Sequence, residues 1–177
     1  MTRSLKLPTK FSAGLGLSLI DRAVKESFAA RCSLSELAEV EAYFEANGGM
    51  LCFYCRSPDP SRWDHLHAVT RGGDTVPGNL VPACGRCDDS KQHRDVEEWA
   101  AGSSQYRPAP NRLPEILRRI EAYRRHFPYT PREFDEKLTD EQRERYARFR
   151  HEIDALRAHL ESAVLITATG GRGRVPG

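Results

Sequence analysis

The feature that most constrains how this chain folds is a repeated C-x-x-C motif, at Cys52–Cys55 and again at Cys84–Cys87. Each motif bends the backbone so that two sulfurs face one point, and two such bends from separate segments complete a four-thiolate shell. Thiolates prefer zinc, and a closed shell leaves the metal no open position for chemistry. The spacing therefore predicts a structural Zn²⁺, with a redox dithiol or two unrelated buried pairs as the alternatives.

The role expected of this metal is to stabilise the fold. The region between the two motifs has few large apolar residues and contains proline turns, which is too little to order itself. Structural zinc contributes on the order of 10 kcal/mol or more of folding free energy at neutral pH. The fifth cysteine, Cys32, is expected to be a buried helical residue rather than a ligand.

Composition argues against a membrane span and for an intracellular, cytoplasmic protein. Charged residues make up 29% of the chain, and no apolar run approaches the roughly 18–20 residues that cross a bilayer. The stretch Leu15–Ile20 is too short and interrupted for a signal peptide, and an odd number of cysteines is atypical of a secreted disulfide scaffold. A net charge of only +2 does not by itself indicate nucleic acid, because what matters is whether basic residues cluster on one face.

Helices are expected on both sides of the cysteine region, where apolar residues recur at three- and four-residue spacing. After an N-terminal arm, one helix is expected over 17–30. A second is capped by Ser33 or Ser35 and stopped by the Asn-Gly-Gly at 47–49. Downstream, a helix is expected over 113–127, and a capping box at Thr139–Gln142 opens a longer one. The last two helices are expected to pair as a hairpin, with a homodimer through the C-terminal helix as the alternative.

The region around the cysteines is expected to contain the strands. Three short strands are predicted, over 50–54, 62–69 and 79–81. Gly72-Gly73 marks a hairpin turn, Pro82 is expected to end the last strand, and a helix is expected from Asp88 to Ala101. The fold class is therefore α+β. The predicted segments are an arm with helices (1–49), the cysteine domain (50–101), a linker (102–112), a helical hairpin (113–166) and a disordered basic tail (167–177).

Four short elements follow one another in the cysteine domain. They are Asp64-His65, Gly72-Gly73, NLVPACGRC at 79–87 and DDSK at 88–91. Together they resemble the HNH endonuclease family in the form that carries zinc-binding cysteine pairs. The resemblance covers about residues 50–100 and does not extend to the flanking helices. It implies a small ββα-metal core, in which two short strands and a helix surround one divalent cation.

The resemblance also implies a role for each of four residues. His65 is similar to the general base that activates the attacking water, and Asp64 is similar to a ligand of the catalytic cation. Asn79 is similar to the middle residue that orients the base and steadies the loop. Asp88 stands where the family normally has His or Asn on the metal. A carboxylate there suits Mg²⁺ or Mn²⁺ and adds negative charge to the site.

These residue types agree with phosphodiester hydrolysis on chemical grounds. The reaction needs a deprotonated water in line with the leaving oxygen and a cation that neutralises charge on the phosphoryl group. A histidine of ordinary pKa, about 6.5, is neutral at cellular pH and accepts a proton. Because neighbours on a strand point to opposite faces, the strand is expected to bend or end at Asp64-His65.

Contacts to the nucleic acid are expected from three basic residues. Lys91 lies three residues past Asp88, on the same helical face, where it could meet a phosphate oxygen. Arg71 and Arg86 are the other two, although any single arginine is as often ordinary surface. Further candidates for phosphate contact are Arg56, Arg62 and Arg94. His67 is a weaker candidate for substrate or metal contact, and Asp89 with His93 is a weaker alternative ligand pair.

The sequence thus predicts a metal-dependent HNH endonuclease of bacterial or phage type that cleaves DNA, with RNA left open as a substrate. It uses Mg²⁺ or Mn²⁺ for catalysis and zinc for structure. The main alternative is a non-catalytic, zinc-stabilised nucleic-acid-binding module with a degenerate second site. A weaker alternative is a helical interaction protein. The retained Asp64-His65 pair favours the enzyme, since a pure binding module has no chemical reason to keep it.

Overall fold

The computed structural model of the protein describes residues 13–170, and within them the side chains of residues 14–163. The chain divides into two compact units. The central unit is Lys25–Lys137, and the terminal unit combines the two flanking segments, Met1–Val24 and Leu138–Gly177. The expected tail from residue 171 on, and the arm before residue 13, lie outside the described residues.

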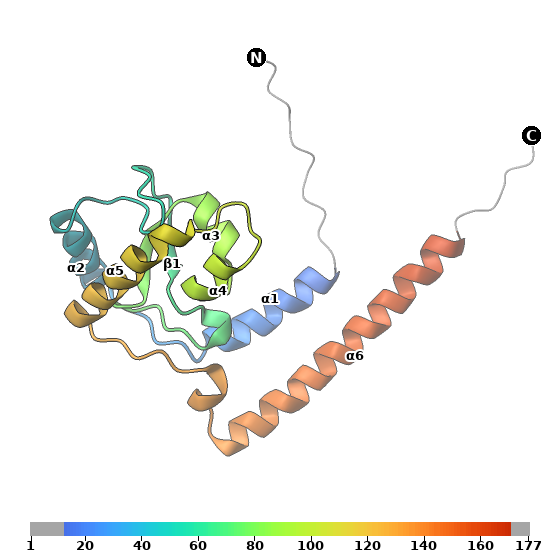
Figure 1. The fold of residues 1–177 in the computed structure, drawn as a ribbon. Helices are drawn as coiled ribbons and strands as arrows, with labels where there is room; N and C mark the ends of the chain where they lie inside the picture. Colours follow the sequence, from blue (N-terminus) through green and yellow to red (C-terminus); the bar gives the residue numbers. More distant parts are fainter. Residues whose placement is uncertain (1–12, 171–177) are drawn as a thin grey trace, which may run out of the picture. The chain divides into compact units, whose positions relative to one another are not determined.

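The elements follow one another as coloured in Figure 1. The central unit contains α2 (Leu34–Ala46), β1 (Arg62–His65), η1 (Val69–Arg71), β2 (Leu80–Ala83), α3 (Gly85–Lys91), α4 (Val96–Ala101), η2 (Pro110–Arg112), α5 (Leu113–His126) and η3 (Phe134–Lys137). The terminal unit contains α6 (Asp140–Gly170) and most of α1 (Ala13–Glu26). Helices beside one small sheet confirm the predicted α+β class.

The sheet consists of β1 and β2, which pair antiparallel with Asp64 opposite Val81 and His65 opposite Leu80. β1 ends at His65, short of the predicted range 62–69, and so agrees with the expectation that the strand bends or ends at Asp64-His65. The prediction that Pro82 ends the second strand is wrong, because β2 continues through it to Ala83. A two-stranded sheet leaves one side of each strand unpaired, so a residue without an N–H group is tolerated there.

The strand predicted over 50–54 is also wrong, because this segment turns. The Arg56 N–H donates to the Cys52 carbonyl at 2.8 Å, and the Phe53 N–H donates to the Pro82 carbonyl at 2.7 Å. The first bond closes the backbone around the first cysteine pair, and the second attaches the turn to β2. Apolar and aromatic residues here supply core contacts rather than a strand.

The single helix predicted from Asp88 to Ala101 is two helices, α3 and α4. The break lies at Gln92, which has a left-handed backbone with φ of +57°. Asp95 then begins α4 with a capping box, since its side chain accepts from the Glu98 N–H and the Glu98 side chain accepts from the Asp95 N–H. α4 is thereby folded back so that the Trp99 indole N–H donates to Ser90 Oγ.

Both helix starts identified from the sequence are confirmed. Ser33 caps α2 and forms a reciprocal capping box with Glu36. At the start of α6 the Gln142 N–H donates to Thr139 Oγ1, and the Thr139 N–H donates to Gln142 Oε1. α2 ends at Asn47, as the Asn-Gly-Gly sequence predicted.

The core of the central unit joins α2, α4 and α5 to the cysteine turn. Its large, fully buried side chains include Trp99, Tyr123 and Ile116. The Tyr123 hydroxyl donates to the Leu80 carbonyl at 2.7 Å, which connects α5 directly to β2. α5 thus buries its apolar face within the central unit. The expected hairpin of α5 with the C-terminal helix concerns the two units relative to one another and stays a prediction.

In the terminal unit, α1 and α6 are joined through Asp21. Its carboxylate accepts from the Tyr146 hydroxyl at 2.7 Å and pairs with Arg150 at 3.1 Å. Leu17 and Ile153 are the buried apolar side chains of this pair of helices. None of the helices in the described part of the chain is both long and apolar enough to span a membrane.

A substitution at Gly73 tests how tightly the loop after β1 is closed. A Cβ atom at this position would lie 1.9 Å from the His67 carbonyl oxygen. We expect Gly73→Ala to lower the free energy of unfolding by about 1–3 kcal/mol or more, because backbone cannot move aside as a flexible side chain can. Gly85→Ala is the control, since its Cβ meets only the end of Arg62 at 3.6 Å. Urea denaturation measures both, and equal stabilities would contradict the tight closure.

Candidate functional site

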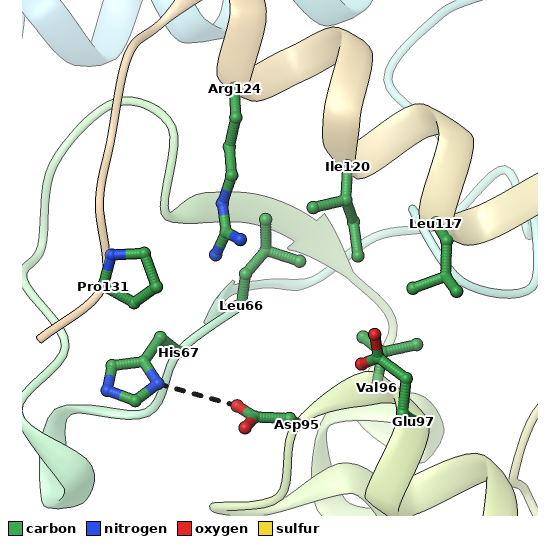
Figure 2. A pocket seen from close by; sticks show the side chains of 9 residues that line it. All are labelled: Leu66, His67, Asp95, Val96, Glu97, Leu117, Ile120, Arg124 and Pro131. Atoms are coloured by element: carbon green, nitrogen blue, oxygen red, sulfur yellow. Dashed lines mark ion pairs between the residues drawn. The ribbon is translucent and has the colours of Figure 1, made fainter. Parts of the chain in front are cut away.

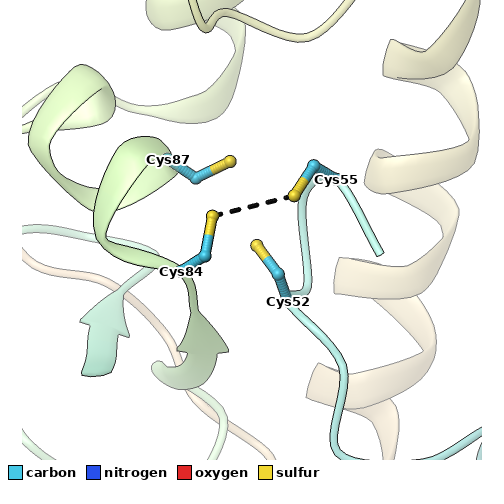
Figure 3. A group of neighbouring side chains, drawn as sticks. All are labelled: Cys52, Cys55, Cys84 and Cys87. Carbon is cyan, nitrogen blue, oxygen red and sulfur yellow. Dashed lines mark hydrogen bonds between the residues drawn. The ribbon is translucent and has the colours of Figure 1, made fainter. Parts of the chain in front are cut away.

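Four sulfurs converge at the start of α3 (Figure 3). Cys52 and Cys55 come from the turn before β1, while Cys84 caps α3 and Cys87 lies in its first turn. All four sulfurs lie within 4.8 Å of one another, and Cys55 Sγ is 3.7 Å from Cys84 Sγ. Tetrahedral metal–sulfur bonds of about 2.3 Å place sulfurs about 3.8 Å apart. The cluster therefore has the ligand type and spacing of a metal site.

The sulfur cluster is the only group of three or more His, Cys, Asp or Glu side chains, within the part of the chain that the structure describes, that lies close enough to hold a metal. A hydrogen bond from Cys87 lowers the pKa of Cys52 to about 4 and raises that of Cys87. Cys32 stays outside the cluster. It lies before α2 and is only half-buried, so the expectation of a buried helical residue is wrong.

Asp64 of β1 is buried, at 5% exposure, and both of its oxygens have partners. The Tyr54 hydroxyl donates to Oδ2 at 2.6 Å, and the Lys91 ammonium lies 3.3 Å from the same oxygen. Burial raises the pKa of Asp64, the charge of Lys91 and the Tyr54 hydrogen bond lower it, and the charge of Asp88 raises it again. The pKa of Tyr54 is raised by its burial and by the charge of Asp64.

Lys91, at the end of α3, is fully buried. Its ammonium donates to the His65 carbonyl at 2.7 Å and reaches Asp64 Oδ1 at 3.5 Å. The expected phosphate contact requires an accessible ammonium, which this conformation does not offer. The face shared with Asp88 was inferred from helical spacing, but spacing does not tell whether that face looks to solvent or to the sheet. Lys91 instead joins α3 to the backbone that carries His65.

His65 is half-buried at the end of β1, and its Nε2 lies 2.9 Å from Thr75 Oγ1. Thr75 is itself held in place through its backbone, which accepts from the Cys32 N–H and donates to the Ala30 carbonyl. The imidazole is therefore oriented by a hydroxyl whose position depends on a segment far away in the sequence. Because a hydroxyl can either donate to Nε2 or accept from it, the contact holds the orientation of the ring in both neutral tautomers.

Asn79 is fully buried and closes the loop between the two strands. Its Oδ1 accepts from the His67 N–H at 2.8 Å, and its Nδ2 donates to the His67 carbonyl at 3.0 Å and the Asp74 carbonyl at 2.7 Å. Three backbone groups are thus satisfied by one side chain. The loop-steadying part of its expected role agrees with this geometry, and its contacts reach the backbone two residues past His65.

Asp88 is partly exposed on α3 and is paired with Arg62 of β1. The Arg62 guanidinium donates to Asp88 Oδ2 at 2.9 Å and also contacts Asp89. This pairing gives Arg62 and both carboxylates partners within the protein. His93 is exposed and lies beyond the end of α3, where helical i,i+4 spacing no longer applies.

The two arginines expected to contact DNA differ in their surroundings. Arg71 is enclosed by carboxylates, 3.0 Å from Asp95, 2.8 Å from Glu98 and 3.2 Å from Glu133. Arg86 is exposed, with its guanidinium 5.9 Å from the centre of the Tyr106 ring. Of the two, Arg86 is the one available to a phosphate in this arrangement, because Arg71 is already neutralised.

His67 lines a separate cavity of about 220 Å³ between the loop after β1, α4 and α5 (Figure 2). Its Nδ1 lies 3.6 Å from Asp95, and its Nε2 is buried with no hydrogen-bond partner among the described residues. Arg124 of α5 lines the same cavity. Asp95 and Glu97 supply opposite charge there, so the lining favours neither an anion nor a cation.

Asp64 and Asp88 fit a catalytic cation by their donor type, since Mg²⁺ and Mn²⁺ select carboxylate oxygens. The charge of Asp88 raises the pKa of Asp64, which places the two carboxylates in one electrostatic neighbourhood. A divalent cation would remove this repulsion. Both carboxylates already have cationic partners, Lys91 and Arg62, so a bound cation would share these oxygens with them or displace them.

Three residues around this site were not recognised from the sequence in the roles they have. Tyr54 binds Asp64, Thr75 binds His65, and Arg62, suggested as a phosphate contact, binds Asp88. Each contact joins segments that are ten or more positions apart. Nothing in local spacing identifies such partners. A buried carboxylate does require a donor, so a tyrosine beside a cysteine ligand was a signal that could have been used.

Comparison with known families identifies the segment that contains these residues. Residues 52–94 match the family model described as HNH endonuclease, which confirms the resemblance for this part of the chain. The matched segment includes both cysteine pairs, Asp64, His65 and Asn79. No curated protein and no solved structure matches the chain significantly.

The pairing of Asp64 with Lys91 makes a prediction about stability. Asp64→Asn leaves a buried ammonium without its counter-charge, and Lys91→Met leaves a buried carboxylate. We expect each change to lower the free energy of unfolding by about 3–5 kcal/mol. The double variant should cost much less than the sum, because it removes both charges together.

Urea unfolding of the wild type, both single variants and the double variant measures this coupling. Arg125→Met is the control, since Arg125 and its partner Glu121 are largely exposed. It should change stability by no more than about 0.5 kcal/mol. Strictly additive costs at Asp64 and Lys91 would mean that the two charges do not stabilise one another.

Proposed function

We propose that this protein is a metal-dependent endonuclease that hydrolyses phosphodiester bonds of DNA. His65 acts as the general base, Asp64 and Asp88 hold a divalent cation, and the cysteine cluster holds a structural zinc. The observation that carries the proposal is the fixed orientation of His65 within the segment that matches the HNH family. Its ring is bonded to Thr75, and its backbone carbonyl is bonded to the buried Lys91.

The chemistry assigned to His65 is proton removal from the attacking water. Neutral imidazole has one N–H and one lone pair, and the Thr75 hydroxyl can bond with Nε2 in either state, so it holds the ring in place while the other nitrogen, Nδ1, is the one proposed to take the proton. The water loses its proton to the ring as its oxygen attacks phosphorus, and the bond to the leaving oxygen breaks. The leaving oxygen takes a proton from solvent, and the ring returns its proton to solvent, so the net reaction consumes one water. Thr75 is a positioning residue in this scheme, because it acts only through the imidazole.

The cation, when bound, neutralises charge on the phosphoryl oxygens and on the leaving oxygen. Asp64 and Asp88 are the residues proposed to hold it as Mg²⁺ or Mn²⁺. Lys91 and Arg62 compete with it for these carboxylates, which predicts weaker binding than at a site with unpaired acids. Arg86, exposed at the start of α3, is the proposed contact for the DNA backbone. RNA is left open as a second substrate.

A second candidate function is a nucleic-acid-binding module that uses the same fold without cleavage. The observation that favours it is that both proposed cation ligands already have cationic partners, Lys91 and Arg62. A protein that never binds the cation would keep these contacts permanently. His65 and Thr75 would then have only a structural role.

The proposal also includes a linker, a cellular location and a homodimer. The linker over 102–112 and the cytoplasmic location follow from the sequence pattern and from the use of cysteine as a metal ligand. A homodimer through α6, on which Leu156 is 45% exposed, would bring two such sites to one duplex and allow both strands to be cut.

Nicking of supercoiled plasmid decides between the two functions. We expect the wild type to nick with Mg²⁺ or Mn²⁺ and not with EDTA. His65→Ala should lose about 10²–10⁴-fold in rate, because the general base is gone. Thr75→Val should lose less, since it leaves the base in place. His151→Ala, an exposed histidine of α6, is the matched control and should nick like the wild type.

Equal nicking by the wild type and His65→Ala would remove His65 from the mechanism. Absence of nicking with every metal, together with retained DNA binding in a gel-shift assay, would favour the binding module.

The zinc assignment makes a separate prediction. Native mass spectrometry should find one zinc per chain, and Cys84→Ser should lose it together with the cooperative unfolding transition, since metal binding is coupled to folding. Cys32→Ser should keep the zinc, because Cys32 lies outside the cluster. A fully folded wild type without metal would refute the structural role.

A further inference from the structure

Arg119, on the face of α5 toward the cysteine turn, has a buried guanidinium group for which the fold supplies no acceptor. Its Nε, Nη1 and Nη2 atoms are all shielded from solvent, and none has a hydrogen-bond partner among the described residues. The nearest carboxylate belongs to the largely exposed Glu115, whose oxygen is 3.9 Å from Nε. A buried cation without acceptors is costly, so this arrangement calls for an explanation.

The position of the group points to the sulfur cluster. The guanidinium carbon lies 5.0 Å from the centre of the Phe53 ring, and Phe53 is the residue between Cys52 and Tyr54 in the cysteine turn. Cys52 and Ile116 of α5 belong to the same buried core. Arg119 is therefore packed directly on the turn that presents the first two sulfurs.

Electrostatics agrees with this placement. Burial lowers the pKa of Arg119, and the charge of Glu115 and, to a smaller extent, that of Cys52 act in the opposite direction. Arg56 and Arg112 also lie close enough to lower the pKa of Arg119. Arg119 therefore has two like charges near it, of which Arg56 already donates to the Gly48 carbonyl at 3.0 Å.

A metal supplies the missing counter-charge. Four thiolates around Zn²⁺ carry a net charge of about −2, and sulfurs in such centres are stabilised by N–H donors around them. We infer that Arg119 is the outer partner of the sulfur–metal centre: its N–H groups donate to the metal-bound thiolates of the cysteine turn, balance their charge and attach α5 to the centre. The inference rests on the proposed zinc and is independent of the nuclease activity.

A phosphate of the nucleic acid is the competing acceptor for Arg119. It is less favoured, because all three nitrogens are shielded from solvent and a phosphate would have to open the packing on Phe53. Arg118, the neighbouring residue on α5, provides the contrast. It is exposed, and its Nε donates to the Pro114 carbonyl.

The test compares Arg119→Met, which keeps apolar packing over Phe53, with the matched control Arg118→Met. Zinc affinity is measured by competition with a chromophoric chelator. We expect a loss of about 10–100-fold for Arg119→Met and little change for Arg118→Met. In cobalt-loaded protein, the sulfur-to-cobalt charge-transfer band of Arg119→Met should move to lower energy, because thiolates that lose N–H donors are more electron-rich.

Equal zinc affinities and an unmoved cobalt band would overturn the inference. So would a loss of DNA affinity in Arg119→Met with zinc affinity unchanged, which would assign the guanidinium to a phosphate. If Arg119→Met does not fold, the wild type loaded with ¹¹³Cd decides. Scalar coupling between the metal and the Arg119 side-chain protons supports the inference, and its absence overturns it. If the wild type binds no metal, there is no sulfur–metal centre and the inference is overturned. Plasmid nicking tests the separate role of His65.

Discussion

The central unit depends on the convergence of two backbone bends at one point, where four sulfurs meet. The first bend precedes the sheet and is attached to it through the bond from the Phe53 N–H to the Pro82 carbonyl. The second begins α3, because Cys84 caps that helix. The sulfur cluster therefore decides where α3 starts and how it lies against the sheet. The contacts of Lys91 with Asp64 and of Arg62 with Asp88 then hold α3 against the sheet.

The position of α3 determines in turn where Lys91 lies. Lys91 ends the helix and is buried against Asp64 and the His65 carbonyl. A buried lysine is tolerated only where its charge and its N–H groups are matched, and here one carboxylate and one carbonyl do so. The sulfur cluster thus acts on His65 without touching it. Its influence passes through one short helix and one ammonium group.

The sequence predicted the parts of this arrangement that depend on local pattern. The cysteine spacing, the caps at Ser33 and Thr139 and the end of β1 at His65 are properties of short segments, and all are found. The strand expected over 50–54 failed because aromatic and apolar residues look alike in a strand and in a metal-binding turn. The break at Gln92 has no local signal, since a left-handed glutamine is unfavourable in isolation and is adopted only because α4 packs back on α3.

The polar partners of the site residues could not be predicted from local sequence pattern, for a different reason. Helical spacing placed Lys91 on the same face as Asp88, but it does not say that the face turns inward. The contact between His65 and Thr75 spans a loop whose shape is set by Asn79. Which donor meets which acceptor is decided by the folded chain, after the elements have been packed.

The terminal unit is built from the two ends of the chain, and this has a consequence for the order of folding. Joining α1 to α6 directly would close a loop of more than a hundred residues, at a cost in chain entropy. The central unit shortens that loop, because Phe28 packs edge-on against Phe134 with ring centres 5.6 Å apart and so brings its own two ends together. α1 and α6 therefore reach a high local concentration relative to one another only once the central unit has formed. Assembly of the two helices is in this way conditional on the folding of the segment inserted between them.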